Sequence, residues 1–395
     1  MPSGTIRWGA WFDDADVVLP FPDGWQVQQC NPRDAPDMGA EEIAAAVASP
    51  IGTSTLRELA VGKRRPCIVI DDLSRPTRGH LLLPPILDEL AAAGIPAHDV
   101  LVLGGVANHR PMVRADLLKK LGPDVLARCR YRNHFSFDNC VAVGDVEINR
   151  DYVESDLRIL VGSVVPHQGA GFSGGAKLLM PGIASATSAL AYHRGPSMEG
   201  RYDDVEVAAR QRSEDVARLV GVDFIVNSVP TARMGVAGVF AGDVVAAHRA
   251  AVAFAREVFA TASPVGVDAA VLSLYPKDTE FLQHITALAP WKTATAPLVR
   301  AGGTIVIAIA GTEGLGTHHL FGPGMPLAAT RATRVRDRNV VLWCPNVELG
   351  ELDPDVASAT NLVRSWAEAM AWLEAEHGPE GTAAVFPCAT IQLSR

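Results

Sequence analysis

Short apolar segments alternate with amphipathic ones along most of the chain. In the first part, this pattern predicts buried strands at residues 66–71, 100–103, 157–161 and 224–229, and helices over 82–93 and 244–259. In the second part, it predicts strands at 267–274, 303–310, 339–343 and 383–386, and helices over 280–288 and 365–377. Strands that alternate with helices are typical of parallel sheets covered by helices, so we expect an α/β fold.

The strand–helix alternation restarts near residue 266, after the segment TASPVG at residues 261–266. Small residues with proline and glycine are typical of a hinge. We therefore expect two α/β domains with largely parallel sheets, at residues 1–265 and 266–395, with an active-site cleft between them. The last segment is expected to pack on the first domain.

Charge and hydropathy exclude several classes of protein. The chain of 395 residues has 35 Lys and Arg against 44 Asp and Glu, a net charge of −9, which argues against a nucleic-acid partner. No apolar run approaches the ~20 residues that a bilayer requires, and Asp13, Asp14 and Asp16 interrupt any signal peptide. The six cysteines form no CxxC pair, so neither a thiolate zinc site nor a disulfide framework is indicated. We expect a reduced, cytoplasmic protein with no membrane partner.

Polar side chains follow two of the predicted strands, where open α/β sheets bind ligands. The segment DDLSRPT at 71–77 places Asp72 and Arg75 directly after the first strand, and GGVANHR at 104–110 places His109 after the second. An arginine fork suits a carboxylate or phosphate. For Asp72 and Arg75 alone, a structural turn with an ion pair is the slightly better interpretation. For His109, the structural and catalytic interpretations are about even.

The segment VVPHQGAGFSGGAKLLMPG at 164–182 is the richest in the chain. It is dense in glycine and contains His167, Ser173 and Lys177. Glycines let the backbone approach a ligand and expose N–H groups to an anion, so we expect this segment to bind a phosphate. An ATP-type loop is excluded, because Ala176 and Leu178 stand where GxxxxGK[ST] requires Gly and Ser or Thr.

His193 lies at the end of a predicted helix, and taken alone it is better explained as a cationic cap of that helix. No His, Cys or Asp pair has ordinary metal-ligand spacing. From the residues alone we conclude that the chain binds a phosphate-bearing ligand or cofactor and performs acid/base chemistry with histidine.

These segments resemble those of the lactate racemase family, whose members use the nickel-pincer nucleotide cofactor. The resemblance is carried by DDLSRPT, by NHRPM and above all by PHQGAGFSGGAKLLMPG, and it extends to YPKDTEFLQ at 275–283. It implies a 2-hydroxy-acid racemase or epimerase, with residues 1–265 as a cofactor-binding catalytic domain and residues 266–395 completing the substrate cleft.

The resemblance also implies which residues hold the cofactor. Lys177 would anchor the nucleotide through a covalent thioamide-type link, and His193 would be the protein's ligand to nickel. The cofactor-binding loop would include Ser173, Gly174 and Gly175. Enzymes that make the cofactor would be partners of this chain.

The remaining implied roles concern the substrate. His109 and His167 would be an acid/base pair on opposite faces of the substrate, Asp72 would help to hold the cofactor, and Arg75 and Gln283 would bind the substrate. A cofactor that accepts hydride converts the hydroxyl carbon into a planar 2-keto centre, and hydride return to the other face inverts it. Each face then needs its own proton acceptor, and histidine titrates near neutral pH.

One position departs from the family. Its lactate-using members carry a substrate-binding lysine three residues after the glutamine, where this chain has Thr286. We therefore expect a substrate other than lactate, such as a larger or differently charged 2-hydroxy acid or a sugar acid, with Lys277 or His284 as substitute cations. Two alternatives remain open: an oxidoreductase with the same cofactor, and a non-catalytic cofactor-binding protein, against which the two histidines argue.

Overall fold

The computed structural model describes residues 1–395, which divide into two compact units. The central unit is Ala35–Val258, and the terminal unit joins Met1–Asp34 to Phe259–Arg395. The predicted domain boundary at residue 265 lies close to the point, between Val258 and Phe259, where the chain passes from the central to the terminal unit. The first 34 residues, however, belong with the C-terminal segment, because β3 (Trp25–Gln29) pairs in parallel with β19 (Gly381–Phe386).

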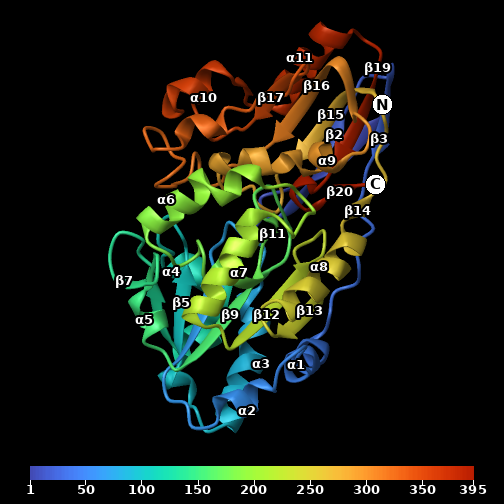
Figure 1. The fold of residues 1–395 in the computed structure, drawn as a ribbon. Helices are drawn as coiled ribbons and strands as arrows, with labels where there is room; N and C mark the ends of the chain where they lie inside the picture. Colours follow the sequence, from blue (N-terminus) through green and yellow to red (C-terminus); the bar gives the residue numbers. More distant parts are fainter. The chain divides into compact units, whose positions relative to one another are not determined.

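The sheet of the central unit has six strands in the order β13-β12-β9-β4-β5-β6 (Figure 1). Five of them run in parallel: β4 (Pro66–Asp71), β5 (Leu101–Gly105), β6 (Arg130–Asn133), β9 (Leu157–Ser163) and β12 (Phe224–Pro230). Only β13 (Val236–Gly242) is antiparallel. The predicted α/β fold with largely parallel sheets is confirmed.

Helices cover both faces of this sheet. Successive side chains of a strand point to opposite faces, and the buried strands carry apolar side chains on both. Ile68 and Ile70 of β4 pack in one core with α1 (Ala40–Ala48), α2 (Leu56–Ala60), α3 (Gly79–Ala92) and α4 (Arg114–Arg128). Cys67 and Val69 point to the opposite core, which contains α5 (Arg150–Val153), α6 (Ala186–Arg194), α7 (Ala208–Val220) and α8 (Ala246–Val258). Short elements complete the unit: β7 (Cys140–Val143), β8 (Val146–Asn149), β10 (Pro166–His167), β11 (Gly171–Phe172), and the 3-10 turns η1 (Ala97–Asp99), η2 (Gly175–Leu178) and η3 (Pro196–Glu199).

The terminal unit holds a second six-stranded sheet, parallel throughout, in the order β18-β17-β16-β15-β19-β3. Its other strands are β15 (Val267–Ser273), β16 (Val299–Ala308), β17 (Asn339–Trp343) and β18 (Asn361–Val363). Two short pairings accompany it: β1 (Ser3–Trp8) with β2 (Ala15–Pro20), and β14 (Ala260–Thr261) with the final strand β20 (Leu393–Ser394).

Short helices connect these strands. They are α9 (Ala289–Thr293), α10 (Pro354–Ser358), α11 (Trp366–His377), and the 3-10 segments η4 (Phe281–Leu288), η5 (Ala328–Arg331), η6 (Leu349–Glu351) and η7 (Ala389–Ile391). The helix predicted over 280–288 is therefore a 3-10 helix. A membrane-crossing helix is absent from the part of the chain that the structure describes.

Candidate active site

A cavity of about 90 Å³ opens at the carboxyl ends of β4 and β5 in the central unit. Three segments build it: the turn after β4, the loop after β5, and the glycine-rich segment that follows β9. Six of the predicted site residues line it, namely Asp72, Arg75, His109, Ser173, Gly174 and Lys177. The fold thus brings together residues that are up to 105 positions apart in sequence (177 − 72).

Asp72 and His109 form a nearly buried pair on one wall of the cavity. The Nδ1 atom of His109 lies 3.0 Å from Oδ2 of Asp72, and the two side chains are 9% and 11% exposed. Burial opposes ionisation of Asp72, but His109, Arg75 and Ser74 outweigh it and hold the pKa of this carboxyl well below its usual range. A carboxylate at Nδ1 favours the tautomer with the proton on that nitrogen and fixes the ring orientation.

A buried lysine stabilises the turn after β4. The sequence did not reveal it as a site residue. Lys120 of α4 is 0% exposed, and its ammonium lies 2.6 Å from Oδ1 of Asp71. The same ammonium donates to the carbonyl oxygens of Asp72 (2.7 Å) and Arg75 (3.1 Å). Lys120 therefore fixes the backbone at both residues whose side chains enter the cavity. Arg75 uses one guanidinium nitrogen to bind Ser74, at 2.9 Å from both its carbonyl and hydroxyl oxygens.

The turn before Lys177 can be built only from glycine. Gly174 and Gly175 have φ of +75° and +57°, a region that side chains rarely adopt. A Cβ on Gly174 would lie 2.4 Å from Oδ1 of Asn227, the same oxygen that accepts a hydrogen bond from the Gly175 N–H (2.9 Å). Ser173 lines the cavity, but its hydroxyl is engaged in the loop itself: it donates to the carbonyl of Ser163 at 2.7 Å and accepts from the N–H of Val165 at 3.0 Å.

Lys177 presents an amine in this cavity without a carboxylate partner. Its Nζ lies 5.4 Å from the ring centroid of Tyr192, and among the described residues no hydrogen bond or ion pair to it is found. Burial, followed by the charges of Arg210 and Arg75, lowers the pKa of Lys177 well below its ordinary value. A lower pKa raises the fraction of neutral, nucleophilic amine, which is the form that covalent attachment of a ligand requires.

The other two predicted histidines do not line the cavity. His193 lies in the last turn of α6, and its ring is 5.5 Å from that of Tyr192, so Lys177 and His193 contact the same aromatic ring. His167 lies on β10, and its Nδ1 accepts a hydrogen bond from the N–H of Gly169 (3.0 Å). The described residues contain no group of three or more His, Cys, Asp or Glu side chains arranged to hold a metal.

Gln283 and Thr286 belong to the terminal unit, where both lie on η4. The Thr286 hydroxyl donates to the carbonyl of Gln283 at 2.8 Å. The interpretation of His284 as a substitute cation is wrong. Its ring is 0% exposed, Nδ1 lies 2.8 Å from the carbonyl of Phe281, and Nε2 lies 2.8 Å from the Thr333 hydroxyl. Burial lowers the pKa of His284 to about 4, so it is neutral at physiological pH.

Comparison with known proteins gives one consistent result. Residues 12–203 match the family model described as the lactate racemase N-terminal domain. The lactate racemase of Lactiplantibacillus plantarum is 30% identical over 290 residues, which is 70% of this chain and 67% of that protein. The lactate racemase of Thermoanaerobacterium thermosaccharolyticum is 30% identical over 295 residues, or 71% and 68% of the two chains.

Solved structures show the same fold. The lactate racemase apoprotein from Thermoanaerobacterium thermosaccharolyticum superimposes with a TM-score of 0.76 at 22% identity, over 99% of this chain and 100% of that one. A protein from Thermotoga maritima gives a TM-score of 0.65 at 16% identity, over 92% and 99% of the two chains.

Proposed function

Because this chain belongs to the lactate racemase family, we propose that it is a racemase or epimerase of a 2-hydroxy acid other than lactate. The observation that carries the proposal is the cavity that Asp72, His109, Arg75 and Lys177 share. It offers an oriented base, a cation suited to a carboxylate, and an amine that can bind a cofactor covalently.

The residues of the central unit fit the nickel-pincer nucleotide of the family. Lys177 would hold it covalently, the Gly174–Gly175 turn packs tightly against Asn227 and His248 directly before Lys177, and His193 would ligate its nickel. A single protein histidine would suffice, because the cofactor would bring its other metal ligands itself. The cavity of about 90 Å³ would hold the reacting end, since whole ligands occupy ~300 Å³ or more. When bound, the cofactor supplies a hydride acceptor.

Arg75 would bind the substrate carboxylate. One of its guanidinium nitrogens is held by Ser74, which fixes the plane of the fork while its other N–H groups can form two parallel bonds to a carboxylate. Substrate held in this way stands beside His109, because both residues line the same cavity.

His109 would take the substrate hydroxyl proton at Nε2, because the Asp72 carboxylate lies 3.0 Å from Nδ1 and favours a proton on that nitrogen. His167 would serve the opposite enantiomer. In the conformation described, its Nδ1 accepts from Gly169, so the neutral ring carries its proton on Nε2. His167 must therefore release Gly169 before it can accept a proton, whereas His109 is ready to accept one.

The environment of η4 supports a substrate other than lactate. Thr286 stands where the lactate-using members have lysine, and its hydroxyl is bonded to the backbone of Gln283. His284 is neutral, and Lys277 is itself only 1% exposed. The carboxylate would then depend on Arg75, and the rest of a larger 2-hydroxy acid or sugar acid would supply further contacts.

The proposal is tested by co-expressing the chain with cofactor-making enzymes, which we infer to be its partners, and incubating it with single enantiomers of a panel of 2-hydroxy acids. We expect chiral chromatography to show conversion to the opposite enantiomer, with the hydrogen at C2 retained in D₂O because it moves as hydride. His109→Ala and His167→Ala should bind cofactor and lose turnover. Deuterium at C2 would contradict hydride transfer, net accumulation of the 2-keto acid would indicate an oxidoreductase, and a loaded but inactive protein would indicate a carrier.

A further inference from the structure

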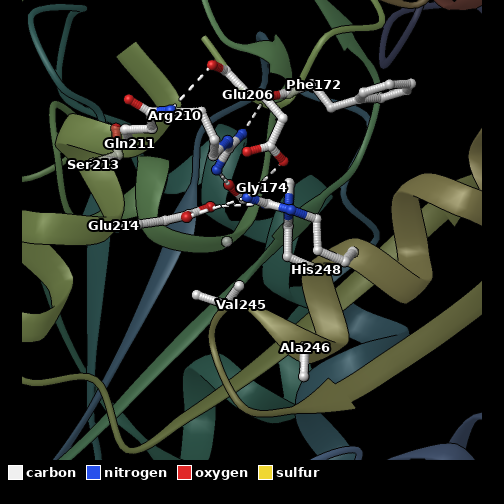
Figure 2. A network of polar contacts seen from close by, with 12 residues as sticks. Phe172, Gly174, Glu206, Arg210, Gln211, Ser213, Glu214, Val245, Ala246 and His248 are labelled. Carbon is white, nitrogen blue, oxygen red and sulfur yellow. Dashed lines mark hydrogen bonds and ion pairs between the residues drawn. The ribbon is translucent and has the colours of Figure 1, made fainter. Parts of the chain in front are cut away.

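A second buried cation stands behind the glycine-rich loop. Arg210 of α7 is 0% exposed, and its guanidinium contacts the carbonyl oxygens of three successive loop residues. It donates to the carbonyl oxygens of Gly174, at 3.0 Å, and of Phe172 (Figure 2). It also donates to the carbonyl oxygen of Ser173 at 3.5 Å.

Arg210 has no carboxylate partner among the described residues. Glu214, on the next turn of α7, is engaged by Arg249 of α8 at 2.7 and 3.2 Å. Burying a cation without an ion-pair partner is costly, and carbonyl dipoles compensate for it only in part. The charge of Arg210 therefore acts on its neighbours with little screening.

His248 of α8 also helps to hold the glycine-rich loop in place. Its Nε2 lies 2.9 Å from the Ser173 carbonyl, and Arg249 lies 3.3 Å from its Nδ1, so the ring donates on one side and accepts on the other. Burial lowers the pKa of His248 well below its ordinary value, so this ring is neutral. A Cβ on Gly175 would lie 2.9 Å from the His248 ring, which shows how closely the loop packs against α8.

We propose that Arg210 is a positioning residue that prepares Lys177 for covalent attachment of the cofactor. Its bonds to the carbonyls of Phe172, Ser173 and Gly174 hold the turn that presents Lys177 to the cavity. Its unpaired charge disfavours a second cation at Lys177 and so favours the neutral amine. This inference rests on the proposed function, in which Lys177 carries the cofactor.

The other groups around Lys177 act in a known direction. Tyr192 of α6 offers a neutral ring, and Arg75 adds to the effect of Arg210. Asp71, Asp72 and His109 line the same cavity. The two carboxylates are engaged by Lys120 and by His109 respectively, so neither is available to stabilise an ammonium at Lys177.

The test uses the cofactor-free protein and an acetyl N-hydroxysuccinimide ester. The amine nitrogen of Lys177 attacks the ester carbonyl, the new N–C bond forms as the C–O bond to N-hydroxysuccinimide breaks, and the displaced proton goes to solvent. Peptide mass spectrometry measures the labelling rate of Lys177 against pH, with the exposed Lys292 as internal standard. Because no cofactor is present, this result is independent of whether the chain is a racemase.

We expect Arg210→Gln to move the pH midpoint of Lys177 labelling upward, which slows labelling at neutral pH by about tenfold for each pH unit that the midpoint rises. Arg210→Lys keeps the charge and should keep the midpoint. Arg212→Gln is the matched control, since Arg212 lies on the same helix but pairs with Asp145 at the surface. The proposal is overturned if folded Arg210→Gln labels with the wild-type midpoint. If Arg210→Gln does not fold, Arg210→Lys provides the test. An upward shift of the Lys177 midpoint in Arg210→Lys overturns the proposal. An unshifted midpoint with slower labelling supports it.

Discussion

The ammonium of Lys120 lies 2.6 Å from Oδ1 of Asp71, beneath the turn that carries Asp72 and Arg75. Burial lowers the pKa of Lys120, and the neighbouring carboxylate of Asp71 opposes that effect. The pair also organises the backbone, since the same ammonium binds the carbonyls of Asp72 and Arg75. The position of two candidate site residues thus depends on a lysine that does not itself line the cavity.

Removing this lysine should destabilise the central unit. Lys120→Met leaves the Asp71 carboxylate and two carbonyls without their donor, and we expect a loss of about 3–5 kcal/mol in the free energy of unfolding. Urea unfolding measures it. The double variant with Asp71→Asn should lose less than the sum of the two single variants, because the second change removes the stranded charge. Additive losses would show that the two side chains are not coupled.

The Asp72–His109 contact should matter for turnover more than for binding. In Asp72→Asn the amide no longer enforces the tautomer with a proton on Nδ1, so we expect kcat to fall by about 100-fold or more with KM little changed. The pKa of Asp72 lies below its usual range, so the carboxylate is ionised throughout neutral pH. Asp99→Asn, at an exposed carboxylate, is the control. Equal kcat in wild type and Asp72→Asn would show that Asp72 does not determine the tautomer on which turnover depends.

The buried His284 should make the terminal unit sensitive to acid. Its pKa is about 4 in the folded chain and near 6.5 when unfolded, so its contribution to stability is complete above pH 6.5. It is lost as pH falls from 6.5 towards 4, at up to about 1.4 kcal/mol per pH unit. Denaturant unfolding of wild type and His284→Gln at pH 7.5 and 5.5 checks this. Wild type should lose more stability than the variant over this interval, and equal losses would contradict the buried neutral ring.

Restoring the missing cation should restore activity on lactate. Thr286 is only partly buried, so Thr286→Lys can extend its ammonium from η4. A charged hydrogen bond contributes about 1.5–3 kcal/mol, so we expect kcat/KM for lactate to rise by roughly 10- to 100-fold. Thr317→Lys, at an exposed position of the same unit, should have no such effect. An unchanged preference would show that Thr286 does not determine the substrate.

Gly62 and Gly174 have similar φ angles but differ in how closely other atoms surround the place of a Cβ. Gly62 has φ of +78° and no atom within 4 Å of the place where a Cβ would stand, whereas at Gly174 (φ +75°) a Cβ would lie 2.4 Å from Oδ1 of Asn227. Both alanine variants carry the cost of a positive φ, about 1–3 kcal/mol, and Gly174 with ψ of −176° lies in a region that is essentially restricted to glycine. Gly174→Ala should be less stable than Gly62→Ala in thermal unfolding and should also fail to take up cofactor. Equal melting temperatures would show that the loop can move away from Asn227.

Much of the site was predictable because its elements are local in sequence. The apolar run 66–71 is β4 itself, and the polar residues after it reach the cavity because parallel strands end at one edge of the sheet. The glycine-rich segment could likewise be recognised as a binding loop from the spacing of its own residues.

What the sequence did not reveal depends on contacts between distant segments. Lys120 and Arg210 read as ordinary polar positions of amphipathic helices, and only the fold places them against the turn after β4 and the glycine-rich loop. The first 34 residues join the terminal unit through a pairing of β3 with β19 that no local pattern indicates. The helical period over 280–288 could not show that hydrogen bonds there follow 3-10 geometry.

The central claim is that Lys177 carries the family's cofactor. Intact mass and nickel content, measured after co-expression with cofactor-making enzymes, test it for wild type, Lys177→Ala and the exposed control Lys292→Ala. We predict a nickel-containing adduct on wild type and on Lys292→Ala that is absent from Lys177→Ala. Wild-type protein without an adduct, under conditions that load a lactate racemase, would contradict the account, as would the same covalent adduct on Lys177→Ala.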